Sequence, residues 1–388
     1  MPGDWAVVMS KTRVLAIVGL LVVSVAGVFF LGRGGDETSP PAEVAGSTPE
    51  ALVNPDEIIS GGPPPDGIPP IDEPKFQPTD EVDWLDEQEP VIVMEIDGDA
   101  RAYPLQIMTW HEIVNDEVGG LPISITFCPL CNTAYTFVRP EVDGEITTFG
   151  TSGKLYNSNL VMYDRATESY WPQAWGKAVM GRLTGTELER VPAQIVSWSD
   201  FRAGFPDGLV LSRDTGHSRD YGSNPYPGYD DIDNPPFLFD GDVDGRLAAV
   251  ERVLGVEAGN KVKAFPYFRL LESAQGTWAA VNSEVGAEPT VVLWKEGTVS
   301  ALDSATIAES RDVGAAAAFS RKMEERTLTF RATESGVVDE ETSSTWSLLG
   351  RAVSGPLEGK RLEPMDAHDS FWFDWAAFHP KTEVWSGG

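Results

Sequence analysis

The chain has 388 residues, of which 41% are hydrophobic, so it is long enough to bury more than one sizeable core. Its 60 acidic residues against 29 basic ones give a formal charge of −31, which repels phosphate and argues against a nucleic-acid partner. The chain holds only two cysteines, which excludes a fold stabilised by a framework of disulfides.

An apolar segment near the N-terminus predicts a membrane anchor. Residues 14–31 carry no charge and would form about 27 Å of helix, enough to cross the hydrocarbon of a bilayer. Lys11 and Arg13 precede this segment, so the excess of basic residues places residues 1–13 in the cytoplasm. The alternative is a cleaved signal peptide, because residues 24–26 are small. We expect a single-pass protein of the cell membrane with most of its chain extracytoplasmic.

The next segment, residues 32–67, is rich in Pro, Gly, Asp and Glu and has few large apolar side chains. Such a composition predicts a disordered, extended linker. Folded sequence should therefore begin at about residue 68.

An internal repeat organises the remaining chain. Residues 176–189 match residues 350–363 at an offset of 174 positions (350 − 176), and the same offset aligns residues 198–206 with residues 372–380. We therefore divide the chain into a first copy with a crossover and a second copy, at residues 68–254 and 255–388.

Within each copy, short β-branched or aromatic segments alternate with Gly, Asn and Asp, which is typical of antiparallel sheet. The alanine run at residues 315–318 aligns with the strand-like residues 133–138, so we expect a strand there as well. The predicted fold is mainly β, with two homologous antiparallel halves and short helices.

Both cysteines lie in the first copy, as Cys128 and Cys131 with Pro129 and Leu130 between them. Two thiolates at this spacing can bind one metal ion, and His111 would supply a third ligand, which suits copper or zinc. Met162 and His217 are weaker candidates for a further ligand. Reversible thiol/disulfide chemistry and a static disulfide are the alternatives.

An enzyme is a further alternative. In it, one cysteine acts as a thiolate nucleophile that His111 activates and Asp116 or Asn115 orients. A binding module without catalysis, in which the cysteines form a fixed disulfide, also stays open. Because the second copy has no counterpart of these cysteines or of His111, we expect the working site to lie in the first copy and the second copy to be inert.

Two other polar segments, residues 154–165 and 240–251, are candidates for binding sites. Residues 154–165 are polar for a strand next to apolar neighbours, so one face is expected either to line a pocket or to bond to nearby loops. Residues 240–251 fit the calcium-loop pattern through four acidic positions, Asp240, Asp242, Asp244 and Glu251. The prolines before them exclude an entering helix, so an acidic surface loop is the alternative to calcium binding.

Several long motifs resemble one known family. They are Ala102-Tyr103-Pro104-Leu105, Trp110-His111-Glu112-Ile113-Val114-Asn115-Asp116, Phe127-Cys128-Pro129-Leu130-Cys131-Asn132-Thr133-Ala134, Phe149-Gly150-Thr151-Ser152-Gly153-Lys154-Leu155-Tyr156-Asn157-Ser158, Met162-Tyr163-Asp164-Arg165, Ser212-Arg213-Asp214-Thr215-Gly216 and Phe371-Trp372-Phe373. Over about residues 67–384 the chain resembles the prokaryotic family called domain of unknown function 3179. The resemblance implies a protein that is typically secreted or membrane-anchored, and it implies no mechanism.

Overall fold

The computed structural model describes residues 48–387, which belong to one compact unit. The expected cytoplasmic segment and membrane anchor lie outside these residues. Within residues 48–387, no helix is both long and apolar enough to cross a bilayer.

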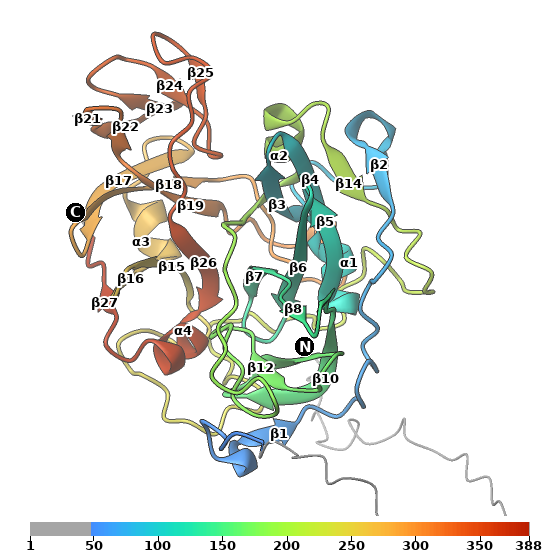
Figure 1. Ribbon diagram of the computed structural model, residues 1–388. Helices are drawn as coiled ribbons and strands as arrows, with labels where there is room; N and C mark the ends of the chain where they lie inside the picture. The colour runs from blue at the N-terminus through green and yellow to red at the C-terminus, as the bar shows by residue number, and fades with distance from the viewer. Residues whose placement is uncertain (1–47, 388) are drawn as a thin grey trace, which may run out of the picture. The chain divides into compact units, whose positions relative to one another are not determined.

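The first half consists of short strands with two short helices (Figure 1). Its elements are the 3-10 helix η1 (Pro55–Glu57), β1 (Ile58–Ser60), β2 (Phe76–Pro78), η2 (Thr79–Glu81), β3 (Pro90–Ile96), β4 (Asp99–Pro104), α1 (Leu105–His111), β5 (Ile113–Val118), β6 (Leu121–Cys128), β7 (Thr133–Val138), β8 (Glu141–Val142), β9 (Glu145–Ile146), β10 (Phe149–Tyr156), β11 (Asn159–Asp164), β12 (Tyr170–Pro172), β13 (Gln194–Ser197), α2 (Trp198–Gly204) and β14 (Leu209–Leu211).

The second half follows a crossover without strands. Its elements are β15 (Arg252–Ala258), β16 (Lys261–Pro266), α3 (Tyr267–Glu272), β17 (Trp278–Val285), β18 (Glu288–Lys295), η3 (Ile307–Glu309), β19 (Ala315–Ser320), β20 (Lys322–Met323), β21 (Arg326–Thr327), β22 (Phe330–Thr333), β23 (Gly336–Asp339), β24 (Thr345–Trp346), β25 (Ala352–Ser354), β26 (Asp366–Phe371), α4 (Trp372–Phe378) and β27 (Glu383–Val384). The prediction of a mainly β fold is confirmed, and the alanine run is a strand.

The two halves have the same strand order. The order β13-β3-β4-β14 in the first half corresponds to β26-β15-β16-β27 in the second, and β5-β6-β7 corresponds to β17-β18-β19. In both halves the last strand pairs in parallel with the second strand, as β14 with β4 and β27 with β16. The second half begins at Arg252, three residues before the expected boundary.

Side-chain hydrogen bonds repeat as well. The Asn115 side chain donates to the Phe149 carbonyl at 2.8 Å and accepts from the Phe149 amide at 3.0 Å. Asn282 makes the same pair of bonds with Phe330, at 2.6 and 2.9 Å. An asparagine that satisfies both backbone groups of one residue fixes how two sheets meet, so the two halves share their internal construction.

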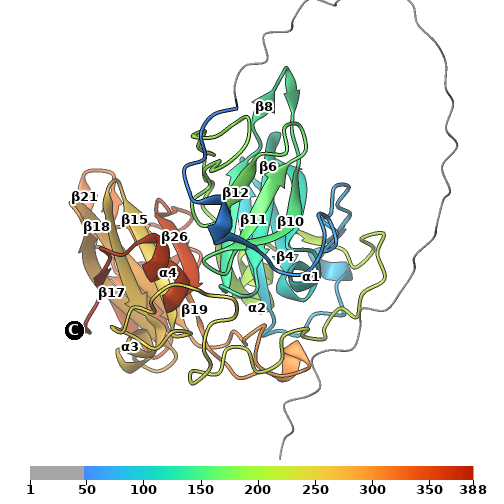
Figure 2. The same ribbon diagram turned by 90° about the horizontal axis from the view of Figure 1, so that it is seen from below.

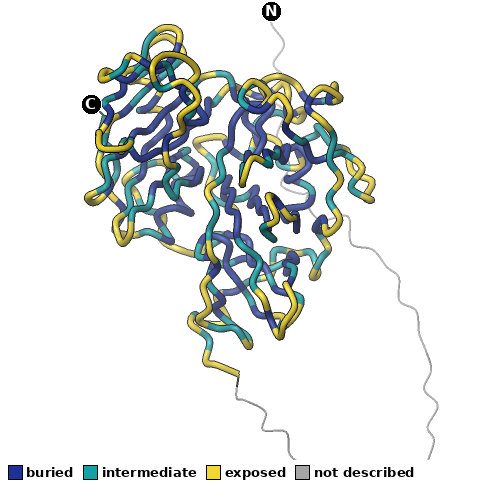
Figure 3. Tube along the Cα trace, turned by 45° about the horizontal axis from the view of Figure 1, so that its top comes forward, coloured by how far each residue is buried: buried dark blue, intermediate teal, exposed yellow. Residues whose placement is uncertain are grey.

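The central strand β3 shows why this sequence forms a layered structure. Val91 and Val93 enter one hydrophobic core while Ile92 and Met94 enter another, because successive strand side chains point to opposite faces. A strand that is apolar on both faces must be covered on both sides. Figure 3 shows the buried chain inside each half, with exposed residues mainly on the connecting loops.

The halves interlock through β26 and β13, the strands that precede their last helices. β26 of the second half lies against β7 of the first, and β13 of the first half lies against β19 of the second. Figures 1 and 2 both show β26 on the side of the second half that faces the first. As a result, one continuous core contains Phe127 and Cys131 from the first half together with Phe371 and Phe373 from the second.

The expectation of an extended linker up to residue 67 is wrong from Thr48 onward. Ile58 is buried, and β1 pairs with β10 and forms the edge of that sheet. The Asp66 amide also donates to the Thr151 carbonyl at 2.8 Å. Proline is tolerated beside β1 because an edge strand pairs on one side only and so needs fewer backbone amide donors.

Candidate functional site

The two cysteines lie in the tight turn between β6 and β7. The Cys131 amide donates to the Cys128 carbonyl at 3.2 Å, and Asn132 adopts a left-handed φ of 52°. This turn brings the two Sγ atoms to 3.1 Å from each other, and both thiols are free. Cys128 is 2% exposed and Cys131 is fully buried, so the pair lies beneath the surface.

A carboxyl group from the second half completes the site. Asn159, at the start of β11, points its Nδ2 both toward Cys131 Sγ, at 3.5 Å, and toward Asp374 Oδ1 in α4, at 3.0 Å. Ser370 donates to the other oxygen of Asp374 at 3.1 Å. The Phe371 amide donates to the Cys131 carbonyl at 2.8 Å, which holds β26 against the cysteine turn.

The low dielectric of this site favours neutral groups. Burial raises the pKa of Asp374 to about 7, although hydrogen bonds with Cys131, Asn159 and Ser370 offset part of that rise. Burial also raises the pKa of Cys131, and contact with Cys128 and the negative charge of Asp374 raise it further. Near neutral pH, Asp374 can therefore either hold or accept a proton beside a thiol.

Glu112 is a second buried acid near the cysteine turn. It ends α1 with a φ of 59°, which is strained for a residue with a side chain, and its carbonyl accepts from the Phe127 amide at 2.8 Å. Burial raises the pKa of its carboxyl to about 8. Burial raises the pKa of Tyr226, and the charges of Glu112 and Cys128 raise it further.

The crossover covers the cysteine turn. The Tyr229 hydroxyl donates to the Leu130 carbonyl at 2.9 Å and accepts from the Phe237 amide at 3.3 Å. Ser158 donates to the Phe237 carbonyl at 2.5 Å. Phe237 and Leu238 themselves are exposed, so the cover presents apolar side chains to solvent.

His111 does not join the cysteines. Its Nδ1 donates to the Pro69 carbonyl at 2.6 Å, so Nε2 is the acceptor of the Tyr221 hydroxyl, also at 2.6 Å. Burial lowers the pKa of His111 to about 4, so the ring is neutral at neutral pH. Both ring nitrogens are occupied, Nδ1 by Pro69 of the N-terminal segment and Nε2 by Tyr221 of the crossover, which differs from the expected role as metal ligand or thiol activator.

The other expected partners of the cysteines also lie elsewhere. Asp116 accepts two hydrogen bonds from Arg101 at 2.8 Å and one from Tyr103 at 2.6 Å, so it stabilises the contact between β4 and β5 and does not orient a histidine. Met162 is buried in the apolar core between its strand neighbours. His217 is exposed, with its ring 5.4 Å from that of His111.

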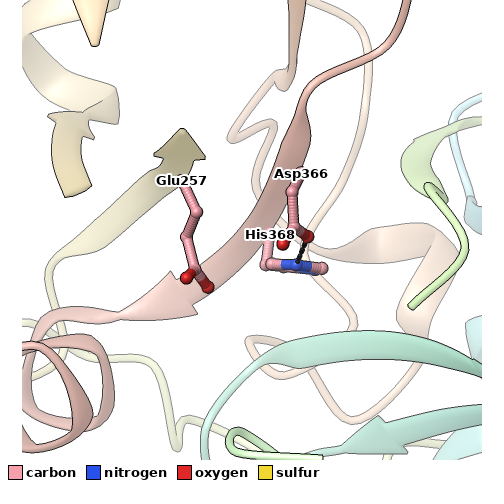
Figure 4. A group of neighbouring side chains, drawn as sticks. All are labelled: Glu257, Asp366 and His368. Atoms are coloured by element: carbon pink, nitrogen blue, oxygen red, sulfur yellow. Dashed lines mark hydrogen bonds and ion pairs between the residues drawn. The ribbon is translucent and has the colours of Figure 1, made fainter. Parts of the chain in front are cut away.

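One group of metal-ligand side chains does meet within residues 48–387. The ligand atoms of Glu257, Asp366 and His368 lie within 4.8 Å of one another (Figure 4). Arg190, however, places its guanidinium 2.6 Å from Glu257 and 3.2 Å from Asp366. Its charge already occupies the place that a cation would take, so we regard this group as an ion-pair network between the halves.

The calcium pattern forms an irregular loop without flanking helices. Arg246 binds both oxygens of Asp244, at 2.9 and 2.7 Å, while Asp240 and Asp242 are exposed. Glu251 is partly buried at the start of the second half. The structure thus fits the acidic surface loop, since an arginine already neutralises the central carboxylate.

Sequence reasoning missed Asp374, Asn159 and Glu112. The repeat did align Asp374 with Asp200, yet nothing in the pattern indicated that the last helix of one half reaches the other half. Asn159 lies in the polar residues 154–165, which form a hairpin turning at Asn157 and Ser158. That unexplained polarity was the one available signal of a buried polar site.

A family comparison covers most of the described chain. The family described as "Protein of unknown function (DUF3179)" matches residues 65–382, which include both halves and every residue of the cysteine site. No curated protein and no solved structure matches the chain. The chain belongs to the DUF3179 family.

Proposed function

We propose that Cys128 and Cys131 form a dithiol/disulfide redox centre and that Asp374 exchanges a proton with Cys131. The observation that carries the proposal is the separation of 3.1 Å between two free thiols whose inner member lies against a buried carboxyl group. Two thiolates on one tetrahedral zinc ion would be about 3.8 Å apart, given Zn–S bonds of about 2.3 Å. The closer approach favours a disulfide over a shared metal.

The reaction reduces a disulfide in a partner molecule. Cys128 attacks one sulfur of that disulfide, the partner's S–S bond breaks, and the first leaving thiolate takes up the proton that Cys128 lost. Asp374 then accepts the proton of Cys131, whose sulfur attacks Cys128 and breaks the mixed disulfide. The second leaving thiolate takes the proton from Asp374, so the partner gains two electrons and two protons while the protein gains an internal disulfide.

Access to the centre requires movement of the crossover. The bonds of Tyr229 to Leu130 and of Ser158 to Phe237 close the site, and each is a single hydrogen bond of modest net strength. The exposed Phe237 and Leu238 offer an apolar contact for the partner next to this closure. Displacing that segment would bring Cys128, the slightly exposed member of the pair, to the surface.

The proposed setting follows from the sequence alone. We infer that the two halves arose by duplication, and that residues 14–31 anchor the chain with its folded part outside the cytoplasm. Disulfide-bearing partners are common in that compartment. The acidic charge of −31 favours a protein or small-molecule partner over a nucleic acid.

Thiol counting on the full chain tests the proposal. After equilibration in mixtures of reduced and oxidised glutathione, the protein is quenched and alkylated in denaturant, and its mass is measured. We expect a two-electron transition from two alkylated cysteines to none. The Cys131→Ser variant should instead stop as a mixed disulfide of Cys128 with glutathione.

Three outcomes contradict the redox centre. Two alkylated cysteines at every glutathione ratio would show that no disulfide forms, and none under strong reductant would indicate a static disulfide. If the purified protein holds stoichiometric copper or zinc, and the double Cys→Ser variant does not, the cysteines bind a metal ion instead.

A further inference from the structure

The second half contains a cavity of about 220 Å³ that no part of the proposed redox centre uses. It lies between α3, the end of β18 and the end of the crossover. Its lining combines polar and apolar side chains, among them Asp230, Glu251, Arg252, Phe268, Leu271 and Trp294.

The equivalent glutamate of the first half, Glu89, is hydrogen-bonded inside the protein. Glu89 and Glu251 are equivalent, because the amides of Trp198 and Trp372 donate to their respective carbonyls at 2.8 Å. The Glu89 carboxylate accepts from the Asp86 amide at 3.0 Å and from the Gln106 side chain at 2.7 Å. Both of its oxygens are therefore satisfied inside the protein.

In the second half this partner is missing. Phe268 stands where the first half has Gln106, since each is the second residue after the proline that precedes the helix. No side chain within residues 48–387 hydrogen-bonds to Glu251, which lines the cavity in a partly buried position. The Glu251 carboxylate contacts the Arg252 backbone but lacks, within the described chain, the side-chain hydrogen bond that Glu89 accepts from Gln106.

Two further polar groups of the lining are buried without a partner. Trp294 and Asp230 are each 2% exposed, and neither Trp294 Nε1 nor Asp230 Oδ1 has a hydrogen-bond partner in the described chain. The Arg252 Nε atom is in the same condition. The other oxygen of Asp230 is bonded by Arg252 and Ser300, at 2.7 and 2.6 Å. Buried polar groups are normally paired, so their gathering in one lining indicates a missing ligand.

One part of the cavity rim is apolar, beside the exposed charged residues Glu296, Arg311 and Asp312 that also line the cavity. Phe268 and Leu271 on α3 are 37% and 55% exposed, and Ile232 of the crossover is 47% exposed. In the first half, the crossover covers the matching face of α1 through Arg213, which donates to Gln106 at 2.9 Å. Within residues 48–387, the exposed Phe268 and Leu271 leave this face of α3 open, so a ligand can reach the cavity from this side.

We propose that this cavity binds a molecule that carries an α-amino group beside a carbonyl or carboxylate oxygen and an apolar side chain. The ammonium group donates to Glu251, while the oxygen accepts from Trp294 and Arg252. The side chain lies on Phe268 and Leu271. A cavity of about 220 Å³ is smaller than the ~300–1,000 Å³ pockets that take drug-sized ligands, so it suits one amino-acid residue.

Calorimetric titration of the full chain tests this assignment. L-leucine is the first probe, and 4-methylpentanoate and isoamylamine are leucine without its amino group and without its carboxylate. We expect leucine to bind at least about tenfold more tightly than either fragment, because each fragment leaves one charged set unpaired. Leucylglycine separates the two sources: equal affinity indicates a peptide N-terminus, and weaker binding indicates the free amino acid.

Matched variants locate the binding. Trp294→Phe keeps the ring and removes its N–H, and Glu251→Gln removes the charge; each should weaken leucine binding about tenfold. Glu284→Gln changes an exposed glutamate outside the cavity and should leave binding unchanged. Near-ultraviolet circular dichroism confirms that each variant is folded.

The proposal fails if leucine gives no saturable heat, if both fragments bind as tightly as leucine, or if folded Glu251→Gln binds leucine as tightly as Glu284→Gln does.

Discussion

The ends of β6 and β18 occupy equivalent places in the two halves but carry different chemistry. The last paired residue of β6 is Cys128, opposite Thr133, and the last paired residue of β18 is Lys295, opposite Ala315. After β6 the chain turns within four residues, 129–132, whereas after β18 it makes the long excursion 296–314. Both ends face an aspartate at the same position of the other half's last helix.

The partners of these two aspartates explain the difference. Asp374 lies in a fully buried contact with Cys131 and keeps a raised pKa, whereas Asp200 forms an ion pair with Lys295 at 2.5 Å. The aspartate is therefore common to both halves, and the residue opposite it decides the outcome. A cation converts it into a structural ion pair, while a thiol leaves it free to exchange a proton. In the proposed redox centre the second half would therefore take part, since Asp374 lies beside Cys131.

The sharpest way to break this comparison is to neutralise each aspartate in turn. Asp374→Asn should slow disulfide exchange by about 100-fold near pH 7, because Cys131 loses the group that accepts its proton. Asp200→Asn should leave the rate unchanged, because it contacts no thiol. Stopped-flow measurement of exchange with oxidised glutathione gives both rates. Equal rates in the two variants would remove Asp374 from the mechanism.

The buried acid Glu112 should affect the pH dependence of the unfolding free energy. Its pKa is about 8 when folded and about 4.5 when unfolded, so the protonated form favours folding and that contribution is lost as pH rises through 8. Relative to Glu112→Gln, the wild type should lose roughly 3 kcal/mol of unfolding free energy between pH 5 and pH 8. Urea unfolding at several pH values measures this difference. Parallel curves for the two proteins would show that the carboxyl group is solvated.

The shared construction of the halves predicts equal responses at matched glycines. Gly176 and Gly350 have φ values of 58° and 69°, and a Cβ atom on either would meet the ring of Phe137 or Phe319, respectively. Alanine at either position should therefore cost about 2–3 kcal/mol of unfolding free energy. Thermal unfolding of the two single variants compares them. A large cost in only one half would show that the packing is not equivalent.

The smallest expected effect concerns the ion pair of the second half. Lys295 and Asp200 keep 24% and 15% of their side chains exposed, so solvent screens their attraction. Lys295→Met should cost about 1 kcal/mol of unfolding free energy and leave disulfide exchange intact. Denaturant midpoints together with the exchange rate check both statements. A change in exchange rate would mean that the two aspartate sites communicate.

Local pattern predicted the fold well. The short β-branched and aromatic segments predicted antiparallel sheet, and the repeat identified β19 as a strand although alanine favours helices. The proline content of residues 48–67 led to the wrong prediction of a disordered linker, because composition does not reveal that β10 is available to pair with β1. Such pairing depends on the tertiary structure, which no local window contains.

The site was only partly predictable for the same reason. The spacing of Cys128 and Cys131 indicated reactive chemistry, yet the nearby His111 proved to bind Pro69 and Tyr221. The acid beside Cys131 comes from a helix far along the chain, and its role depends on how the halves interlock. Closeness in sequence thus suggested His111 as the neighbour of the cysteines. The repeat did align Asp374 with Asp200, but it could not show that Asp374 contacts Cys131.

The interlocked halves also set an order of events during synthesis. The cysteines leave the ribosome 243 residues before Asp374 (374 − 131), so an incomplete chain carries thiols without their proton acceptor. The proposed redox centre is complete only when α4 has docked. Any truncated product that lacks α4 would consequently keep its cysteines but have no assembled redox centre.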